Sequence, residues 1–510
     1  MTTVITLSRN ENQALGLGKF AVEFMSGKLG APGSGALDRT QMFFTDSMIC
    51  GISAIALGTN APRVLRAEAL AYEQAHGVPI LGSTVRVCPE KAIVANSAAV
   101  REWDANGTNF GYNPAAGHTA GEFGHNDFYP VAVAAAQVAG RDGADALRGM
   151  LLLDEIRGRL AEVFSLKSYK IDHVVHGAVA SAATYGAMLG ATPQQIESAI
   201  GMVIAHYIPW RAIRAGRQLS DSKGASAAIS TEVAVLAMQR SIRGFVGPAD
   251  IFRNPEAIFR VFEGPDADDA SPFDLILTHS GDDFAVTGMH FKLGLYEHQS
   301  AGALAGVISL LQDNPRLLEA PDRIAAIKVL AYEPAYGIIG DPAKRDPHTR
   351  QSADHSMVYI IATTVRKAMD LAAEHGPDVL GHGDEGWKKL MLVPSDYTDD
   401  SIMHAGTRAL MEKITFDHGG PDYDARYPDG IPTSVLLTAD DGTTHDSGLV
   451  MYPAGHARNT TADLGDLLAN KWKKLASLAV DEPQAIIDRF NSLPGLSAAQ
   501  LASLHDFTIR

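Results

Sequence analysis

Helical periodicity dominates the first half of this chain and limits the folds open to it. Residues 60–77 and 143–164 carry apolar side chains at helical spacing, with charged side chains between them. Residues 181–207 predict two consecutive helices, the second with Thr192 as N-cap and Gln195 completing a capping box. Segments of this kind predict a body of packed helices.

The pattern changes after about residue 285. Residues 324–332 and 433–453 are rich in β-branched residues, and the second segment contains the turn sequence DDGT, which predicts a hairpin. Residues 356–376 return to helical spacing, whereas 375–430 predict loops with short elements. The tail from 460 to 495 is helical again, and we expect it to rejoin the first helical body.

The length predicts more than one core, because 510 residues exceed what one ordinary core accommodates. We predict a mainly α protein with a large all-helical domain and a smaller inserted α+β lid domain. The helical domain would comprise residues 1–285 and the returning helices of 456–510. The lid domain would comprise residues 286–455.

Composition excludes several classes of function. The net charge is −16 and no Lys/Arg block stands out, which argues against nucleic-acid binding. No apolar run is long enough to span a bilayer, and the first residues lack the pattern of a secretion signal, so we expect a cytoplasmic protein that does not bind membranes.

The sequence also lacks the common motifs that bind cofactors and metals. Two cysteines are too few for the usual ligation of an iron–sulfur cluster, and there is no H-E-x-x-H or C-x-x-C motif for a metal. No glycine-rich phosphate or dinucleotide loop follows a predicted strand. We therefore expect no cofactor and no metal, and chemistry carried out by acids, bases and cations.

The first polar stretch is WDANGTNFGYNPAAGHTAGEFGHNDF, residues 103–128. Asp104 and Thr108 are spaced i, i+4 and would share a face on a last helical turn. The following glycine-rich loop would deliver His125 to the same pocket. The alternative is that these residues only cap helices and form turns.

A second stretch places His173 ahead of a helix rich in small residues. The positive end of a helix dipole disfavours imidazolium, and a neutral imidazole is what a general base requires. The alternative is a histidine that hydrogen-bonds within a helix junction.

A third stretch gathers Arg211, Arg214, Arg217 and Lys223 just before and at the start of a predicted helix. Cations that converge on a helix N-terminus form an anion site. The alternative is a solvated basic face.

A fourth set comes from the second domain and comprises Lys292, His298, Tyr336 and His355. If the domains form a cleft, these residues would face the first three groups across it, which is a common place for a small-molecule site. Each of them could instead be structural.

Taken in order, these stretches resemble the MmgE/PrpD family. Asp104, Thr108 and His125 match the family segment D-x-x-D-T…H-P, although Gly107 replaces its second Asp and Asn126 replaces its Pro. The loop between them is also longer than usual.

The later stretches resemble the family's remaining motifs. IDHVVHGAVASAA matches a segment with an active-site histidine, at His173. The family's two lysine-bearing segments are matched by SDSKGASAA, at Lys223, and by FKLGLYEHQSA, at Lys292. DPHTRQSADHSMVYI is similar to the dehydratases' DP…RE…DHSLPYI, and Tyr336 matches a family tyrosine.

The resemblance implies a homodimer without a metal or organic cofactor, acting as a hydro-lyase on a 2-hydroxy-tricarboxylate such as 2-methylcitrate, which it would convert to 2-methyl-aconitate. The alternatives are decarboxylation of cis-aconitate, epimerisation of a related polycarboxylate, and an inactive tricarboxylate-binding dimer. The candidate catalytic residues are His173, His125, Asp104, Lys223 and Lys292. The candidate substrate-binding residues are Thr108, Arg211, Arg217, Tyr336 and His298.

Overall fold

The computed structural model describes residues 3–110, 123–214, 218–263 and 268–510. Helices make up most of this part of the chain, and its strands form small sheets, one of four strands and three of two. The mainly α class predicted from the sequence is confirmed.

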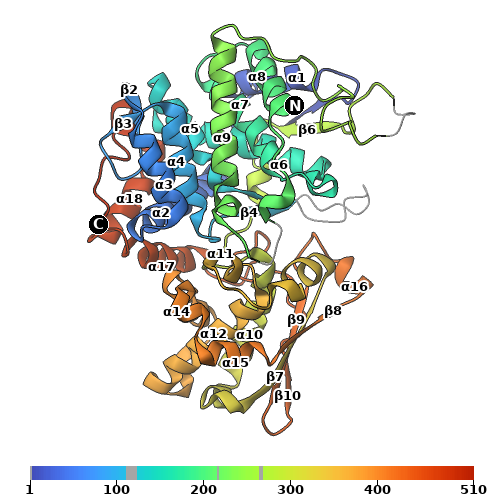
Figure 1. The fold of residues 1–510 in the computed structure, drawn as a ribbon, viewed down its shortest axis with the longest axis vertical. Helices are drawn as coiled ribbons and strands as arrows, with labels where there is room; N and C mark the ends of the chain where they lie inside the picture. The colour runs from blue at the N-terminus through green and yellow to red at the C-terminus, as the bar shows by residue number, and fades with distance from the viewer. Residues whose placement is uncertain (1–2, 111–122, 215–217, 264–267) are drawn as a thin grey trace.

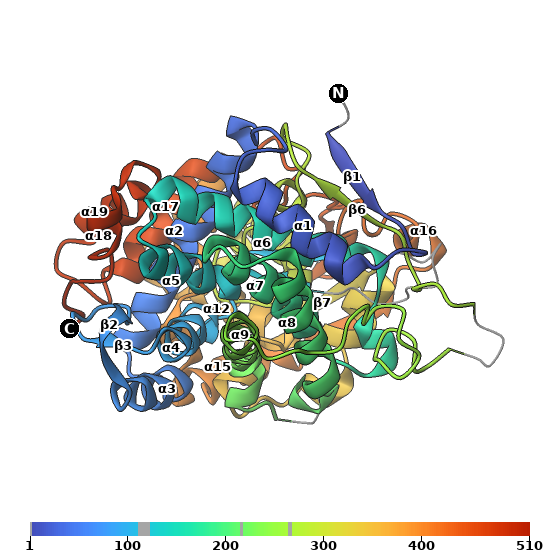
Figure 2. The same ribbon diagram turned by 90° about the horizontal axis from the view of Figure 1, so that it is seen from above.

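Helices of the first half pack into one helical body, shown in the upper part of Figure 1. At its centre lies α7 (Val174–Met188), in which every residue is buried. Figure 2 shows α7 surrounded by its neighbours, and α7 contacts α1, α5, α6, α8 and α9. The other helices of this body are α1 (Gln13–Met25), α2 (Ser34–Ala56), α3 (Asn60–Leu70), α4 (Pro89–Glu102), α5 (Tyr129–Ala139), α6 (Gly143–Val163), α8 (Pro193–His206) and α9 (Asp221–Ile242).

Small residues allow these helices to approach closely. A Cβ atom at Gly177 on α7 would lie 2.0 Å from the ring of Phe128, so only glycine fits there. The predicted junction between α7 and α8 is confirmed, since Gly190 has a φ of +79° and Thr192 and Gln195 form both hydrogen bonds of the capping box.

The predicted helix over 60–77 is wrong beyond Leu70. There α3 ends, and the chain continues as strand β2 (Glu73–Pro79), which pairs with β3 (Arg86–Val87). Gly77 makes this pairing possible, because a Cβ atom there would lie 2.1 Å from the carbonyl oxygen of Val87.

A second body follows in the chain, in the lower part of Figure 1, and we call it the sheet body. Its four-stranded sheet has the order β10-β9-β7-β8, in which β7 is parallel to β8 and antiparallel to β9. The strands are β7 (Ile324–Ala331), β8 (Ile414–His418), β9 (Thr433–Ala439) and β10 (Thr444–Asp446). The hairpin predicted for 433–453 is confirmed by the antiparallel pair of β9 and β10.

Helices cover this sheet. α10 (Ala301–Asp313) packs on β9, and α12 (Met357–His375) packs on α10 and α15. The prediction of a helix over 356–376 is confirmed, with Ser356 as its N-cap. Shorter helices complete this body: α11 (Arg350–Ala353), α13 (Asp384–Leu390), α14 (Asp399–Ile402), α15 (Ala405–Met411) and α16 (Pro421–Asp424).

The last helices return to the helical body, as expected. α17 (Leu464–Ala476) and α18 (Pro483–Asn491) both pack on α2, and the short α19 (Ala498–Leu501) packs on α5. In Figure 1 this C-terminal segment lies beside the blue N-terminal helices. The division of the chain at 285 and 455 into two domains remains our proposal.

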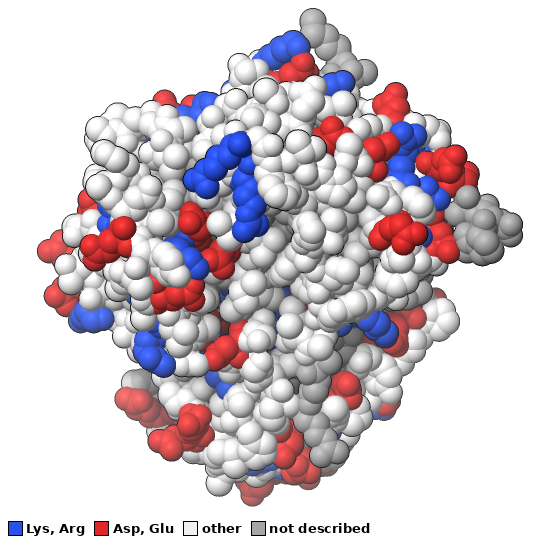
Figure 3. Space-filling model, turned by 45° about the horizontal axis from the view of Figure 1, so that its top comes forward, with Lys and Arg blue, Asp and Glu red and all other residues white. Residues whose placement is uncertain are grey.

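Two further strand pairs fasten segments of the helical body. β1 (Val4–Leu7) pairs with β6 (Leu275–Thr278), and β4 (Thr108–Phe110) pairs with β5 (Phe123–His125). Among the described residues no single helix is long and apolar enough to cross a bilayer, and the one pair of helices that passes the test together, α2 with α3, is bent by 89°. Charged side chains of both signs are scattered over the face shown in Figure 3.

Candidate active site

A pocket with about 560 Å³ of empty space, part of it open to solvent, lies where the two bodies meet. Seven of its lining side chains are lysines or arginines and only two are carboxylates, so the pocket opposes the negative charge of the whole chain. The lining residues are Arg101, Asp104, Lys167, His173, Arg211, Arg214, Leu219, Lys223, Lys292, Glu297, Ile339, Lys344 and His355.

Asp104 is the buried carboxylate around which several of these cations gather. It follows the end of α4 and forms ion pairs with Lys292, with Lys223 at 3.3 Å and with Arg101 at 3.5 Å. Burial alone would raise the pKa of Asp104, but Arg101, Lys292 and Lys223 outweigh it and hold this pKa well below its usual range. Asp104 is therefore an anion that organises the cations of the pocket.

Lys223 joins the two bodies through a second carboxylate. It lies in the first turn of α9, is only 2% exposed, and donates to Asp354 of the sheet body at 2.7 Å. Its Nζ also lies 2.9 Å from Nδ1 of His355. Burial lowers the pKa of Lys223, and burial likewise lowers that of Lys292, against the pull of their carboxylate partners.

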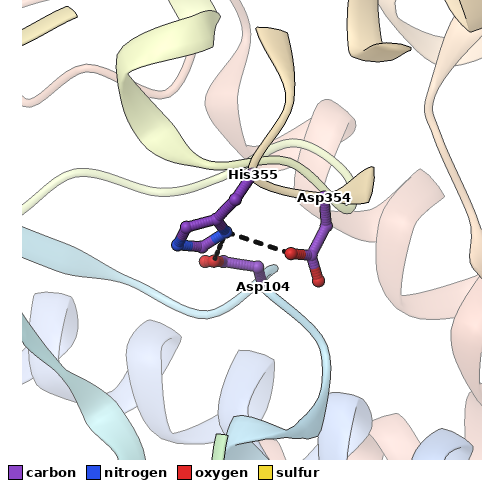
Figure 4. Close-up of side chains that lie close together, drawn as sticks. All are labelled: Asp104, Asp354 and His355. Atoms are coloured by element: carbon purple, nitrogen blue, oxygen red, sulfur yellow. Dashed lines mark hydrogen bonds and ion pairs between the residues drawn. The ribbon is translucent and has the colours of Figure 1, made fainter. Parts of the chain in front are cut away.

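Three side chains lie as close together as the ligands of a metal site, namely Asp104, Asp354 and His355. Their potential ligand atoms all lie within 4.8 Å of one another, and Figure 4 shows His355 bonded to both carboxylates. The Lys223 ammonium, however, is within 3.3 Å of all three side chains and takes the place that a cation would occupy. This donor set fits a cluster centred on a lysine better than a divalent metal.

His173 forms another part of the pocket as the N-cap residue of α7. Its Nε2 lies 3.8 Å from Asp172, and Asp172 is itself bound by Arg214 at 2.5 Å and approached by Arg211 at 3.7 Å. Burial lowers the pKa of His173 well below its usual value, and the nearby arginines oppose the effect of Asp172. The imidazole is therefore neutral, as expected from the sequence.

The sheet body contributes Glu297 and Lys344 to the pocket. Burial, with the nearby Asp104 anion, raises the pKa of Glu297 to about 7, and burial lowers the pKa of Lys344 to about 8. Glu297 accepts a hydrogen bond from the backbone of Gln299 at 2.9 Å, and its own backbone N–H donates to Asp354. Two groups that titrate near neutral pH thus face the cation cluster.

Five of the candidate residues line this one pocket: Asp104, His173, Arg211, Lys223 and Lys292. Arg214 and His355, which belong to the predicted polar stretches, line it too. Arg217 and the side chain of His125 lie outside the described residues, although the backbone of His125 ends strand β5.

Three candidates lie elsewhere. Tyr336 is 39% exposed and packs beside the ring of His418, away from the pocket. His298 is buried in a stack of rings with His290, which in turn stacks on His456. Neither residue lines the pocket, although the charges of Lys292 and Asp104 act on His298, and their substrate-binding role stays a prediction.

Thr108 is the third, and the helical turn expected to carry it with Asp104 is wrong. α4 ends at Glu102, and Trp103 is already extended, so Thr108 falls on strand β4. Its backbone pairs there with His290. This bridge ties the segment bearing Asp104 to the segment bearing Lys292, which is a structural role.

Gly107 and Asn126, the two positions at which the sequence departs from the family segment, lie in contact with each other. A Cβ atom at Gly107 would lie 2.3 Å from both the side chain of Asn126 and the ring of Phe43. An aspartate at position 107 therefore has no room here, and the two departures form one local adjustment.

Some residues that line the pocket escaped the sequence reasoning. Arg101 and Lys167 were overlooked because each stands in a helical or loop segment without a recognisable motif. Lys344 has no local sequence signal at all. A partial signal did exist for Asp354, because the dipeptide Asp-His occurs at 172–173, 354–355 and 417–418, and the first two of these pairs bear on the pocket.

Two family models match the chain: the MmgE/PrpD N-terminal domain over residues 24–270 and the MmgE/PrpD C-terminal domain over residues 389–492. The chain belongs to the MmgE/PrpD family. This confirms the resemblance found in the sequence.

Relatives of this MmgE/PrpD protein agree with that membership. It is 23% identical to the "probable 2-methylcitrate dehydratase" of Saccharomyces cerevisiae, over 88% of this chain and 84% of the relative. It is 23% identical to the 2-methylcitrate dehydratase of Escherichia coli O157:H7, over 83% and 82%. With the mitochondrial 2-methylcitrate dehydratase of Yarrowia lipolytica it shares 26% identity over 61% of this chain, and the match spans only 55% of that relative. The prediction of a lyase-type enzyme is confirmed at the level of the family.

Proposed function

We propose that this MmgE/PrpD protein dehydrates a 2-hydroxy-tricarboxylate, with 2-methylcitrate as the substrate and 2-methyl-aconitate as the product. The observation that carries the proposal is a pocket in which cations gather around a neutral histidine and an ionised carboxylate. A polyanion suits such a pocket, and the names of the relatives point to the same substrate class.

The chemistry begins with removal of a proton from the carbon next to the hydroxyl-bearing carbon. That carbon also bears a carboxylate, so the intermediate gains negative charge that fixed cations must stabilise. Lys223, Lys292 and Arg211 line the pocket and supply that charge. We assign the base to His173, because its imidazole is neutral and lies in the pocket.

Loss of hydroxide completes the reaction. The carbon–oxygen bond breaks, the carbon–carbon double bond forms, and hydroxide takes up a proton to leave as water. We assign the proton donor to His125. Asp104, bound to both lysines, keeps them charged and aligned, because an ionised partner favours their protonated forms.

The proposal is tested by turnover of the His173→Ala variant. Its kcat for 2-methylcitrate should fall about 10²–10⁴-fold, as expected when a positioned base is removed. His206→Ala, which alters an exposed histidine at the end of α8, should retain wild-type activity. Full turnover by His173→Ala would end the assignment of the base.

Product analysis separates the rival activities. The wild-type protein is incubated with 2-methylcitrate, citrate and cis-aconitate, and alkene absorbance and CO₂ release are followed separately. Alkene formation from 2-methylcitrate supports the dehydratase. Release of CO₂ from cis-aconitate supports the decarboxylase instead, and stabilisation by ligand without turnover supports an inactive binding protein.

We also propose that the protein forms a homodimer. Four large apolar side chains of neighbouring segments are exposed: Tyr169, Ile208, Trp210 and Phe262. Tyr169 stacks on Phe262, and the backbone of Trp210 pairs with that of Ile171. Exposed apolar patches of this kind mark protein interfaces. Light scattering should give the mass of a dimer for the wild type, and Trp210→Asp should give a monomer; a monomeric wild type would overturn this proposal.

A further inference from the structure

Lys344 forms no close ion pair among the described residues, and Glu297 and Asp341 act on its charge only from beyond that distance. Arg101 and Lys292 pair with Asp104, Lys223 pairs with Asp104 and Asp354, and Arg214 pairs with Asp172. In the described part of the chain, no acceptor or carboxylate lies within hydrogen-bonding or ion-pairing distance of Lys344 Nζ, although its side chain lines the pocket. Its charge is therefore available to a ligand.

The backbone around Lys344 is held in place from both sides. Asp341 caps the short helix Pro342–Lys344 by accepting from Ala343 at 2.8 Å. Arg345, the next residue, donates to the carbonyl of Ile414 at 2.9 Å and to that of Met411 at 3.2 Å. Lys344 is half-buried at this fixed turn, unlike a lysine that extends freely into solvent.

Five other cations of the pocket already have carboxylate partners. Asp104 forms ion pairs with Arg101, Lys223 and Lys292, and Asp172 forms ion pairs with Arg211 and Arg214. Because these carboxylates already neutralise part of the positive charge, the pocket offers a substrate with three carboxylates less charge than the number of its cations indicates. An unpaired cation in the same pocket supplies the missing charge.

We propose that Lys344 binds one carboxylate of the substrate from the side of the sheet body, and that it sets the preference for tricarboxylates over dicarboxylates. This inference rests on the proposed function, since it concerns how the same pocket recognises its substrate. It adds a specificity residue outside the motifs singled out in the sequence, at a position where the spacing of residues gave no indication.

The groups that face Lys344 define how its role depends on pH. Burial lowers the pKa of Lys344 to about 8, Glu297 and Asp341 act to raise it, and Lys223 and Arg211 act to lower it. The side chain is therefore protonated below about pH 8 and loses its charge above that. Glu297, with a pKa of about 7, is already ionised in this upper range. Burial also lowers the pKa values of Lys223 and Lys292, so the part of the loss above pH 8 that belongs to Lys344 is the part that Lys344→Arg abolishes.

The test measures calorimetric dissociation constants for tricarballylate, which has three carboxylates, and for glutarate, which has two. For Lys344→Met, binding of tricarballylate at pH 7.5 should weaken about 10- to 100-fold, the effect of losing one charge-assisted hydrogen bond, while glutarate binding changes little. Lys344→Arg should retain affinity for tricarballylate and keep it at pH 9, where the wild type weakens. The matched control is Lys328→Met, an exposed lysine of β7 paired with Asp417.

The outcomes separate this inference from the proposed function. If the wild type binds tricarballylate and Lys344→Met binds it equally well, the inference is overturned and the proposed function stands. If the wild type binds neither acid and turns over no tricarboxylate, both are overturned. Turnover gives a second readout, because Lys344→Met should raise KM for 2-methylcitrate with little change in kcat. A fall in kcat at constant KM overturns the binding role.

Discussion

Lys223 donates a hydrogen bond of 2.7 Å to Asp354, a residue 131 positions further along the chain. The bond joins the first turn of α9 in the helical body to the turn that precedes α12 in the sheet body. Arg350 reinforces the junction, since it binds Asp354 at 3.1 Å and Glu102 of α4 at 2.6 Å. The pocket is thus held together by ion pairs between the bodies that form its walls.

Replacement of Asp104 by Asn should disable the site while preserving its shape. The variant removes the negative charge shared by Lys223, Lys292 and Arg101. Removing one partner of a buried ion pair costs about 3–5 kcal/mol in the free energy of unfolding, so denaturant unfolding should show a loss of that order. Turnover should fall by at least about 10²-fold, since the lysines lose the anion that aligns them.

The control for Asp104→Asn is Asp283→Asn, which alters a carboxylate that is 91% exposed. This control should unfold like the wild type, because exposed ion pairs contribute little. Near-normal turnover by Asp104→Asn would contradict the role given to Asp104.

Removal of divalent metals should leave the activity unchanged. The Lys223 ammonium lies within 3.3 Å of Asp104, Asp354 and His355, the three side chains that could otherwise bind a metal together. Steady-state rates should therefore be equal before and after dialysis against a chelator. A loss of rate that one particular divalent ion restores would show that a metal displaces the lysine.

Local sequence signals predicted the parts of this protein that depend on near neighbours. The capping box of Thr192 and Gln195 follows from residues three positions apart, and His173 at the start of α7 follows from the helix pattern behind it. Lys223 and Lys292 were found through short motifs. His173, Lys223 and Lys292 all line the pocket.

Long-range contacts account for what the sequence could not predict. Strand β8 was not predicted within 375–430, since its pairing with β7 depends on residues almost ninety positions away. Thr108 was misplaced because α4 ends at Glu102, where Trp103 is extended and its indole donates to Ser53, 50 positions away. Lys344 reaches the pocket only through the turn that Arg345 anchors to the loop and strand around Ile414.

Replacement of Glu297 by Gln should change how stability depends on pH. The pKa of Glu297 in the folded protein is raised to about 7, so the folded state retains its proton between about pH 4.5 and 7 while the unfolded state releases it. The contribution of Glu297 to the free energy of unfolding of the wild type is therefore lost as the pH rises through that window. Glutamine resembles the protonated acid, so the variant should gain in Tm relative to the wild type between pH 5 and pH 8.

The pH series needs a matched carboxylate outside the pocket. Glu412→Gln alters an exposed glutamate after α15, and its Tm difference from the wild type should be the same at both pH values. A constant difference for Glu297→Gln as well would contradict the raised pKa of this group.

Lys471 gives the sharpest test of how the C-terminal helices support the site. Its ammonium, on α17, is buried and donates to Asp46 of α2 at 2.9 Å, to the carbonyl of Ala105 at 2.6 Å and to the carbonyl of Lys292 at 2.9 Å. Ala105 follows Asp104 directly, so one side chain holds the backbone beside both members of the Asp104–Lys292 pair. Lys471→Met should cost about 3–5 kcal/mol, because it leaves Asp46 buried without its cation.

Lys471→Met should also lower kcat, because the backbone that positions Asp104 and Lys292 loses its shared donor, and small misplacements of reacting groups are costly. Adding Asp46→Asn should recover part of the stability by removing the unpaired charge, but not the turnover, since the two carbonyl bonds stay lost. The control is Lys473→Met, an exposed lysine of the same helix. If Lys471→Met unfolds at the same denaturant concentration as Lys473→Met, the last helices do not support the site in this way, and α17 serves only to cover α2.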